Sequence, residues 1–274
     1  MDCQRLARLL GWETLFSNAD ESLSLQVEQP CYALLATSHQ LLENPPIGRP
    51  VRKEAVLAIR GTQTMQDVVT DIRAIPEEFN PSQSALWAAL KGLPRPSQRQ
   101  SDNEEEDFDA YADEHSDEET TEPEPGSECE LMQQWEWLRG SSHLPPVDES
   151  GVPIELKKYA CGGMSRAAMN LLREVGPSLM KLHLAGYAIK VVGHSLGGAV
   201  AAMLTYLLMS VKKWSRPLDI KCVTYGCPSC VDATIADLLA EKGVVISAVL
   251  HDDVISRITP QSIRCFRVTA ASEL

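Results

Sequence analysis

The sequence lacks the usual features of a secreted, a membrane-spanning or a nucleic-acid-binding chain. No basic start followed by an apolar run opens it, so we expect no signal peptide. No stretch approaches the roughly 20 apolar residues that cross a bilayer, and the longest apolar segment, residues 199–211, is expected to be a core helix. Aromatic residues make up only 5% of the chain, too few for a platform that stacks single-stranded nucleic acid. We therefore expect a protein of the cytoplasm or of the cytoplasmic face of a membrane.

Basic residues are also scarce, and the acidic residues are concentrated in one segment. Fifteen Asp and Glu, without a single Lys or Arg, lie between Asp102 and Glu130, and without them the net charge of −13 would become +2. Binding to phosphate backbones needs the opposite sign, so we expect no nucleic-acid partner. The segment belongs to a low-complexity insertion, residues 94–150, expected to be mostly disordered with a local helix near 131–138. Within it, Ser116 precedes three acidic residues and is a candidate site for an acid-directed kinase.

The eight cysteines are scattered singly, apart from the pair Cys227 and Cys230. Without a secretory signal, we expect them to be reduced thiols. A Cys-x-x-Cys pair can be a redox or a metal site, but a single pair lacks the second ligand pair of a zinc site. Because the pair follows a predicted strand at a turn, we favour a structural role for it.

Hydrophobic spacing predicts one α/β domain that spans residues 1–274. Leucines at intervals of three and four predict a helical N-terminal segment, residues 1–50. From residue 55 onward, strands and helices alternate, which favours a doubly wound, mostly parallel sheet. The expected strands are 55–59, 188–192, 220–225 and 244–250, and the expected helices are 164–184, 195–212 and 232–242. Gly176-Pro177 should kink or break the first of these helices.

The run Gly193-His194-Ser195-Leu196-Gly197 carries the candidate chemistry. It fits the Gly-x-Ser-x-Gly nucleophile elbow, and it lies where a predicted strand turns into a predicted helix. Side chains at the two glycine positions would collide with neighbouring backbone in so tight a turn. Ser195 is thus the candidate nucleophile, and Leu196 offers a backbone N–H to an oxyanion at the start of the helix. His194 is expected to be a structural neighbour whose side chain points away from Ser195.

Two further positions complete this candidate site. Arg60-Gly61-Thr62 follows a short apolar strand, and Thr62 is placed to give a second oxyanion donor. The acid should follow the serine at the end of a later strand, where His251-Asp252-Asp253 stands. An adjacent pair of Asp residues could equally cap a helix.

These segments together resemble the class 3, or fungal-type, lipase family, and within it the sn-1-specific diacylglycerol lipases. The resemblance rests on residues 55–62, 65–71, 163–164, 192–198, 224–228 and 251–257. It implies an α/β-hydrolase fold, a serine ester hydrolase acting on acylglycerols at a membrane surface, and no cofactor other than the calcium that the family allows. It makes Ser195 the nucleophile, Asp253 the triad acid, and Thr62 and Leu196 the oxyanion donors. Asp253 is preferred to Asp252 because the family's acid directly precedes two apolar residues.

The sequence also departs from the family pattern. Cys161 stands where a His is common, and Ser256 replaces the usual Pro. No His follows His251, so the triad His is not found and the fold is expected to be truncated at its C-terminus. Two hypotheses remain. The sequence is either an incomplete or alternatively spliced form of an ester hydrolase acting on acylglycerols, or a catalytically impaired lipase-like protein that binds lipid or a partner.

Overall fold

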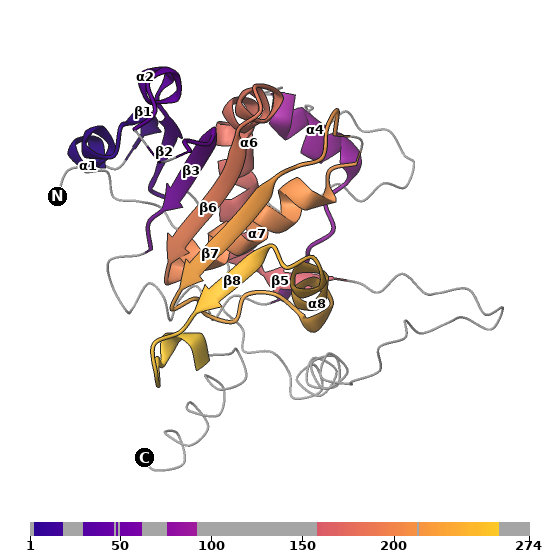
Figure 1. Ribbon diagram of the computed structural model, residues 1–274. Helices are drawn as coiled ribbons and strands as arrows, with labels where there is room; N and C mark the ends of the chain where they lie inside the picture. The colour runs from indigo at the N-terminus through magenta and orange to yellow at the C-terminus, as the bar shows by residue number, and fades with distance from the viewer. Residues whose placement is uncertain are drawn as a thin grey trace, which may run out of the picture.

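The computed structural model describes residues 3–18, 30–46, 48, 50–61, 76–91, 158–212 and 214–257. Six strands in these ranges form one sheet in the order β1-β2-β3-β6-β7-β8 (Figure 1). The strands are β1 (Trp12–Ser17), β2 (Tyr32–Thr37), β3 (Glu54–Ile59), β6 (Ala188–His194), β7 (Ile220–Tyr225) and β8 (Val245–Ala248). β3, β6, β7 and β8 pair in parallel, and their arrowheads point to the same edge of the sheet (Figure 1). The predicted mostly parallel sheet is confirmed.

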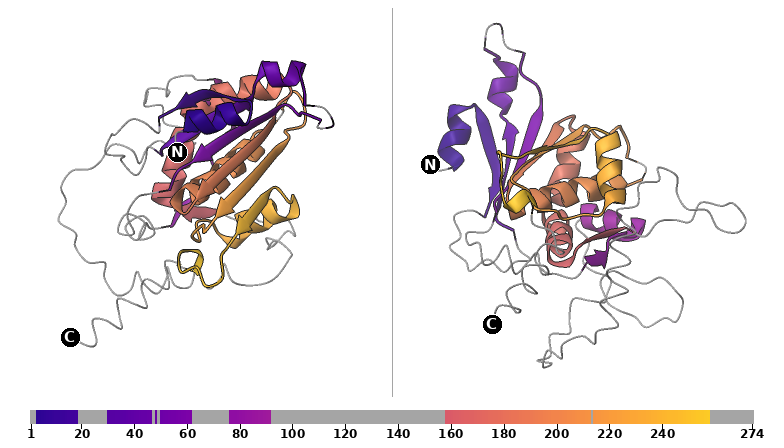
Figure 2. Two further views of the ribbon diagram at one scale, coloured as in Figure 1. Left: turned by 60° about the vertical axis from the view of Figure 1, so that its left-hand side comes forward. Right: turned by 90° about the horizontal axis from the view of Figure 1, so that it is seen from below.

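The helices are α1 (Cys3–Leu9), α2 (His39–Glu43), α4 (Gln83–Lys91), α6 (Gly162–Leu184), α7 (Leu196–Ser210) and α8 (Ala233–Glu241). Of these, α4, α6, α7 and α8 contribute buried side chains to the main core. α7 lies directly on β6 and β7, and it is buried along nearly its whole length because α6 packs against its other side. Figure 2 shows α1 on the opposite side of the strands from α6 and α7. None of the helices in the described part of the chain is both long and apolar enough to cross a membrane.

A second, two-stranded sheet lies where the chain re-enters the core after the acidic insertion. β4 (Pro76–Glu78) pairs antiparallel with β5 (Tyr159–Cys161), and the N–H of Phe79 donates to the carbonyl of Lys158. Phe79 is fully buried and packs against Tyr206 of α7, with ring centroids 5.6 Å apart. The segments on both sides of the insertion therefore pack on the same core. The insertion itself, residues 94–150, lies outside the described residues, as does Ser116.

The helical prediction for residues 1–50 is wrong over much of its described part. Only α1 and α2 are helical, whereas β1 and β2 form an antiparallel pair that extends the sheet. Leu34 and Leu35, which fit a helical spacing, lie in β2 instead. The pattern failed because nearly all of β2 is buried, and a strand buried on both faces shows a continuous apolar run rather than alternation.

The expected strands 55–59, 188–192, 220–225 and 244–250 and the expected helices 164–184, 195–212 and 232–242 are confirmed to within a few residues at each boundary. Helix α6 is continuous through Pro177, so the break considered there does not occur. Gly176 lies so close to α4 that a Cβ there would be 3.2 Å from the carbonyl oxygen of Ala89. Tertiary packing of this kind stabilises a helix against a local preference to break.

The all-round burial of α7 makes its central leucines the most sensitive positions of the core. Leu204 is fully buried, and Leu204→Ala should lower the free energy of unfolding by about 2–5 kcal/mol, because it removes buried methyl groups and leaves a cavity. Leu184 at the end of α6 is 57% exposed, so Leu184→Ala should change this free energy by less than about 0.5 kcal/mol. Urea unfolding followed by circular dichroism measures both. Equal losses for the two variants would contradict this account of the core.

Candidate active site

The turn between β6 and α7 holds Ser195 in a conformation that L-residues rarely adopt. Its φ is 54° and its ψ is −127°. The N–H of Ser195 donates to the carbonyl of Tyr225 in β7 at 2.8 Å, and its own carbonyl accepts from the N–H of Gly198 at 2.9 Å. The backbone of the elbow is thus fixed to the neighbouring strand and to its own helix. The half-buried serine lies where β6 meets α7, as the motif predicts.

Both elbow glycines are required by close approach of backbone. A Cβ at Gly193 would collide with the carbonyl of Gly197. A Cβ at Gly197 would lie 2.5 Å from the carbonyl oxygen of Ile59 and 2.6 Å from that of Arg60. No side chain fits at either position, so the end of β3 can lie directly against the first turn of α7. The mechanical role predicted for these glycines is confirmed.

The oxyanion positions are only partly covered by the structure. Leu196 is the first residue of α7, so its N–H belongs to the unpaired donors at a helix N-terminus. Thr62, the other predicted donor, lies outside the described residues. Gly61 directly before it approaches the elbow, because a Cβ there would be 3.2 Å from the Cβ of Ser195. Thr62 therefore directly follows a residue that lies beside the nucleophile, and its role as an oxyanion donor stays a prediction.

The two acids after β8 have different environments. The side chain of Asp252 is 99% exposed and makes only a surface ion pair with Arg257, at 3.3 Å. Asp253 is half-buried, and its Oδ1 accepts a hydrogen bond from the N–H of Ile255 at 3.0 Å. The donor, Ile255, is the first residue of a short 3₁₀ helix, Ile255–Arg257. Asp253 therefore also acts as a cap for this helix. Its second oxygen, Oδ2, is not used by that bond.

The position of Oδ2 depends on Gly226, whose role the sequence analysis missed. Gly226 follows β7 with a φ of 55°, and a Cβ there would lie 2.6 Å from Asp253 Oδ2 and 4.0 Å from Nε2 of His194. The carboxylate of Asp253 thus rests over the bare Cα of Gly226, on the side that faces the elbow histidine. A glycine directly after a predicted strand was the available signal, but nothing local in the sequence indicates which side chain would occupy the space.

The described histidines are spread over the fold. His194 is exposed at the end of β6, opposite Tyr225 in the register, and His251 is exposed beside the acids with a φ of 46°. His183 is buried in α6 against Trp214, and burial together with the charge of Arg216 lowers its pKa. His39 pairs with Glu43 in α2. Among the described residues, no histidine is hydrogen-bonded to Ser195 or Asp253; His115 and His143 lie outside them.

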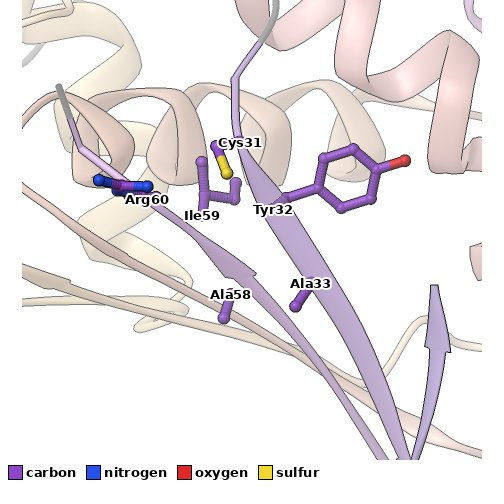
Figure 3. Close-up of a pocket in the computed structure, with 6 residues that line it drawn as sticks. All are labelled: Cys31, Tyr32, Ala33, Ala58, Ile59 and Arg60. Carbon is purple, nitrogen blue, oxygen red and sulfur yellow. The ribbon is translucent and has the colours of Figure 1, made fainter. Parts of the chain in front are cut away.

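A cavity of about 200 Å³ adjoins the elbow at the ends of β2 and β3. It is lined by Cys31, Tyr32, Ala33, Ala58, Ile59 and Arg60. In Figure 3 the Tyr32 ring is turned away from Ile59 and Arg60, and its hydroxyl donates to Glu174 at 2.7 Å. The walls are otherwise mainly apolar, and Ile59 and Arg60 also contact Gly197 of the elbow.

The part of the chain that the structure describes contains no group of three or more His, Cys, Asp or Glu side chains able to hold a metal ion.

Comparisons with known proteins match the chain to a lipase family model and to the fold of solved lipases. The family model "Lipase (class 3)" matches residues 133–263. The structure is similar to the lipase from Rhizopus microsporus var. chinensis, with a TM-score of 0.52 and 14% identity, over 96% of this chain and 61% of that one. The Lip2 lipase from Yarrowia lipolytica matches with a TM-score of 0.48 and 17% identity, over 92% and 62% of the two chains. The chain thus spans less than two thirds of these lipases.

No curated protein matches the chain in sequence. At 14% identity, the similarity to the Rhizopus microsporus lipase establishes the fold, and the family model covers the elbow, the β7 turn and both acids. The resemblance to the class 3 lipases is therefore confirmed, and the chain has the α/β-hydrolase fold of that family.

Proposed function

We propose that this chain is a serine ester hydrolase of the lipase type, which cleaves acylglycerols, with diacylglycerol as its main substrate. The observation that carries the proposal is the strained backbone of Ser195, held between β6 and α7 by two glycines that admit no side chain. Strain of this kind persists in proteins mainly where function requires it. A structural strand-to-helix turn needs neither a serine at this position nor an acid facing it.

The reaction follows from these positions. Ser195 Oγ attacks the ester carbonyl, and the N–H of Leu196 together with Thr62 stabilises the negative charge on the carbonyl oxygen. The alcohol leaves, and water then releases the fatty acid from acyl-Ser195. In this proposal a histidine takes the serine proton and Asp253 orients its imidazole; no described histidine is bonded to Asp253, and Oδ2 is the carboxylate oxygen available for this. The apolar cavity at Ile59 supports an acyl or alkyl chain as the part of the substrate beside the elbow.

Exposed apolar side chains support action at a lipid surface. Tyr225, Val249, Leu250 and Val254 are 47–76% exposed, and they lie around Asp253 at the ends of β7 and β8. Exposed apolar groups gathered in one region are typical of protein and membrane contacts. Cys31, Cys161, Cys222, Cys227 and Cys230 are free thiols, which fits the cytoplasmic face of a membrane.

A second function is binding without turnover. It is favoured by one observation: among the described residues, no imidazole is bonded to Asp253. A reaction with a fluorophosphonate probe separates the two functions, because the probe forms a covalent bond only with a serine whose proton is removed. Labelling of Ser195 supports the hydrolase, whereas an unlabelled chain that still binds diacylglycerol vesicles supports the second function.

Removal of the nucleophile should abolish the reaction. Ser195→Ala is expected to lose fluorophosphonate labelling entirely, and to lose fatty-acid release from phosphatidylcholine vesicles with added diacylglycerol by about 10⁵- to 10⁶-fold. Mass spectrometry identifies the labelled peptide, and vesicles without diacylglycerol show whether the phospholipid itself is cleaved. Equal release from the two kinds of vesicle would contradict diacylglycerol as the main substrate. Retained labelling in the variant would contradict Ser195 as the nucleophile.

The two neighbouring acids provide a matched pair of variants. Asp253→Asn should slow labelling and turnover by about 10⁴-fold, because an amide holds the imidazole in the wrong tautomer. Asp252→Asn should leave both rates within about threefold, because its side chain is in water and its ion pair with Arg257 is on the surface. Rates measured under identical conditions decide this. The reverse order of effects would make Asp252 the acid.

Two glycines with nearly the same positive φ allow the effect of displacing Asp253 to be separated from the general cost of a side chain at positive φ. Gly226 and Gly243 have φ values of 55° and 56°, but a Cβ at Gly243 has no neighbour within 4 Å. Alanine at either position costs about 1–3 kcal/mol of stability for its positive φ. Only Gly226→Ala should also displace Asp253, and a shift of about 1 Å can lower the rate about 100-fold. Thermal unfolding and labelling rates, measured together, test this, and equal labelling rates for the two variants would contradict it.

A further inference from the structure

Four cysteines lie together near the first turn of α7. Cys161 ends β5, Cys222 lies in β7, and Cys227 and Cys230 follow β7. The N–H of Cys161 donates to the carbonyl of Cys230 at 2.9 Å, and the Cys161 thiol lies 3.8 Å from the carbonyl oxygen of Ser229. Segments that are 60 residues apart in the sequence thus bring their thiols to one place. The function proposed above uses none of these thiols.

Within this group, Cys227 and Cys230 are the pair that interacts most strongly, and Cys227 is the more accessible residue. The Cys227 thiol donates to the carbonyl of Pro228 at 3.2 Å. Cys230 is only 5% exposed, while Cys227 is half-buried. Contact with Cys227, followed by burial, raises the pKa of Cys230. Burial raises the pKa of Cys161 to about 11 and that of Cys222 to about 12.

A metal site is the other use to which clustered cysteines are put. A structural zinc site needs four side chains in a tetrahedral arrangement. The described residues contain no group of three or more His, Cys, Asp or Glu able to hold a metal ion. The contact of two thiols, one buried and one reachable from solvent, fits thiol–disulfide chemistry instead.

We propose that Cys227 and Cys230 are a redox-active dithiol that hydrogen peroxide oxidises to a reversible disulfide. The sulfur of Cys227 attacks one peroxide oxygen, which breaks the O–O bond and gives a sulfenic acid and one water. The sulfur of Cys230 then attacks the sulfenic sulfur, so the S–S bond forms and the second water leaves with the Cys230 proton. In total, two thiols and one peroxide give one disulfide and two waters. A dithiol reductant reverses the reaction.

The position of the pair connects it to the catalytic turn. Cys227 directly follows Gly226, the residue beneath the Asp253 carboxylate. On its other side, the Cβ of Cys227 is 3.3 Å from where a Cβ of Gly198 would be, within the first turn of α7. A bond from Cys227 to Cys230 therefore changes the backbone next to both Asp253 and the elbow. This consequence, unlike the disulfide itself, rests on the proposed function.

Peptide mapping of the full chain tests the disulfide. The protein is treated with hydrogen peroxide, alkylated with iodoacetamide, and digested without reductant. We expect the peptide that contains Cys227 and Cys230 to be two hydrogens lighter and to carry no alkyl group. Treatment with dithiothreitol before alkylation should restore alkylation of both sulfurs. Cys161→Ala and Cys222→Ala are matched controls that should keep the link. Cys230→Ala should leave Cys227 as a sulfenic acid, which dimedone captures.

The outcomes are distinct. A wild-type chain in which peroxide oxidises Cys227 but leaves Cys230 open to alkylation would overturn the proposal, as would a link from Cys227 to Cys161 or Cys222. Absence of any oxidation of Cys227 would also overturn it. These readouts require no enzymatic activity, so they decide on the disulfide even if Ser195 is never labelled.

A second measurement tests the connection to the active site. Oxidation should slow fluorophosphonate labelling of Ser195 by about tenfold in the wild type, because small displacements of an oriented group lower rates strongly. The Cys230→Ala variant should show no such slowing. Equal labelling of the oxidised and reduced wild type would overturn the connection, and a wild type that is unlabelled in both states would count against the proposed function alone.

Discussion

Ser195 holds a backbone conformation, with φ 54° and ψ −127°, that costs an L-residue about 1–3 kcal/mol. The contacts around it keep the residue there. Its N–H is bonded to Tyr225 of β7, and the end of β3 presses against Gly197 at distances that exclude any side chain. Because α7 begins one residue later and is buried on almost every side, relaxation of the turn would have to move the central helix of the core. The packing of α7 therefore maintains the strain at the nucleophile.

The same constraint gathers the rest of the site. Parallel strands end at a common edge, so the carboxyl ends of β3, β6, β7 and β8 bring residues 61, 195, 226 and 253 near one another. The hydrogen bond from Ser195 to Tyr225 links the nucleophile to the turn that contains Gly226, and the N–H of Gly226 donates to Ala248 at the end of β8. A chain of backbone bonds thus runs across three strands, from the serine to the segment of the acid. Geometry at Asp253 and geometry at Ser195 are not independent.

Much of this could be predicted from the sequence because its signals are local. The glycines around Ser195, the alternation of strands and helices after residue 55, and the acid at a strand end each depend on a few neighbouring residues. The N-terminal segment was mistaken for helix because buried β2 carries leucines on both faces. The role of Gly226 could not be predicted, since it depends on a side chain 27 positions later in the chain. The cysteine cluster was missed for the same reason: Cys161 and Cys230 meet only after β5 has packed beside the turn that follows β7.

The Cys-x-x-Cys pair shows how a structural role and a chemical role can coincide. The sequence favoured a structural interpretation, and buried thiols do behave as small apolar side chains. Cys161 and Cys222 fit it, because burial raises their pKa. Cys227 differs in one respect, its access to solvent, and it lies between Gly226 and the first turn of α7. Only one reachable sulfur is needed to start the oxidation, and the buried partner then completes the disulfide without being exposed itself. The packing that makes most of the cluster inert also keeps that partner in contact with the reachable thiol.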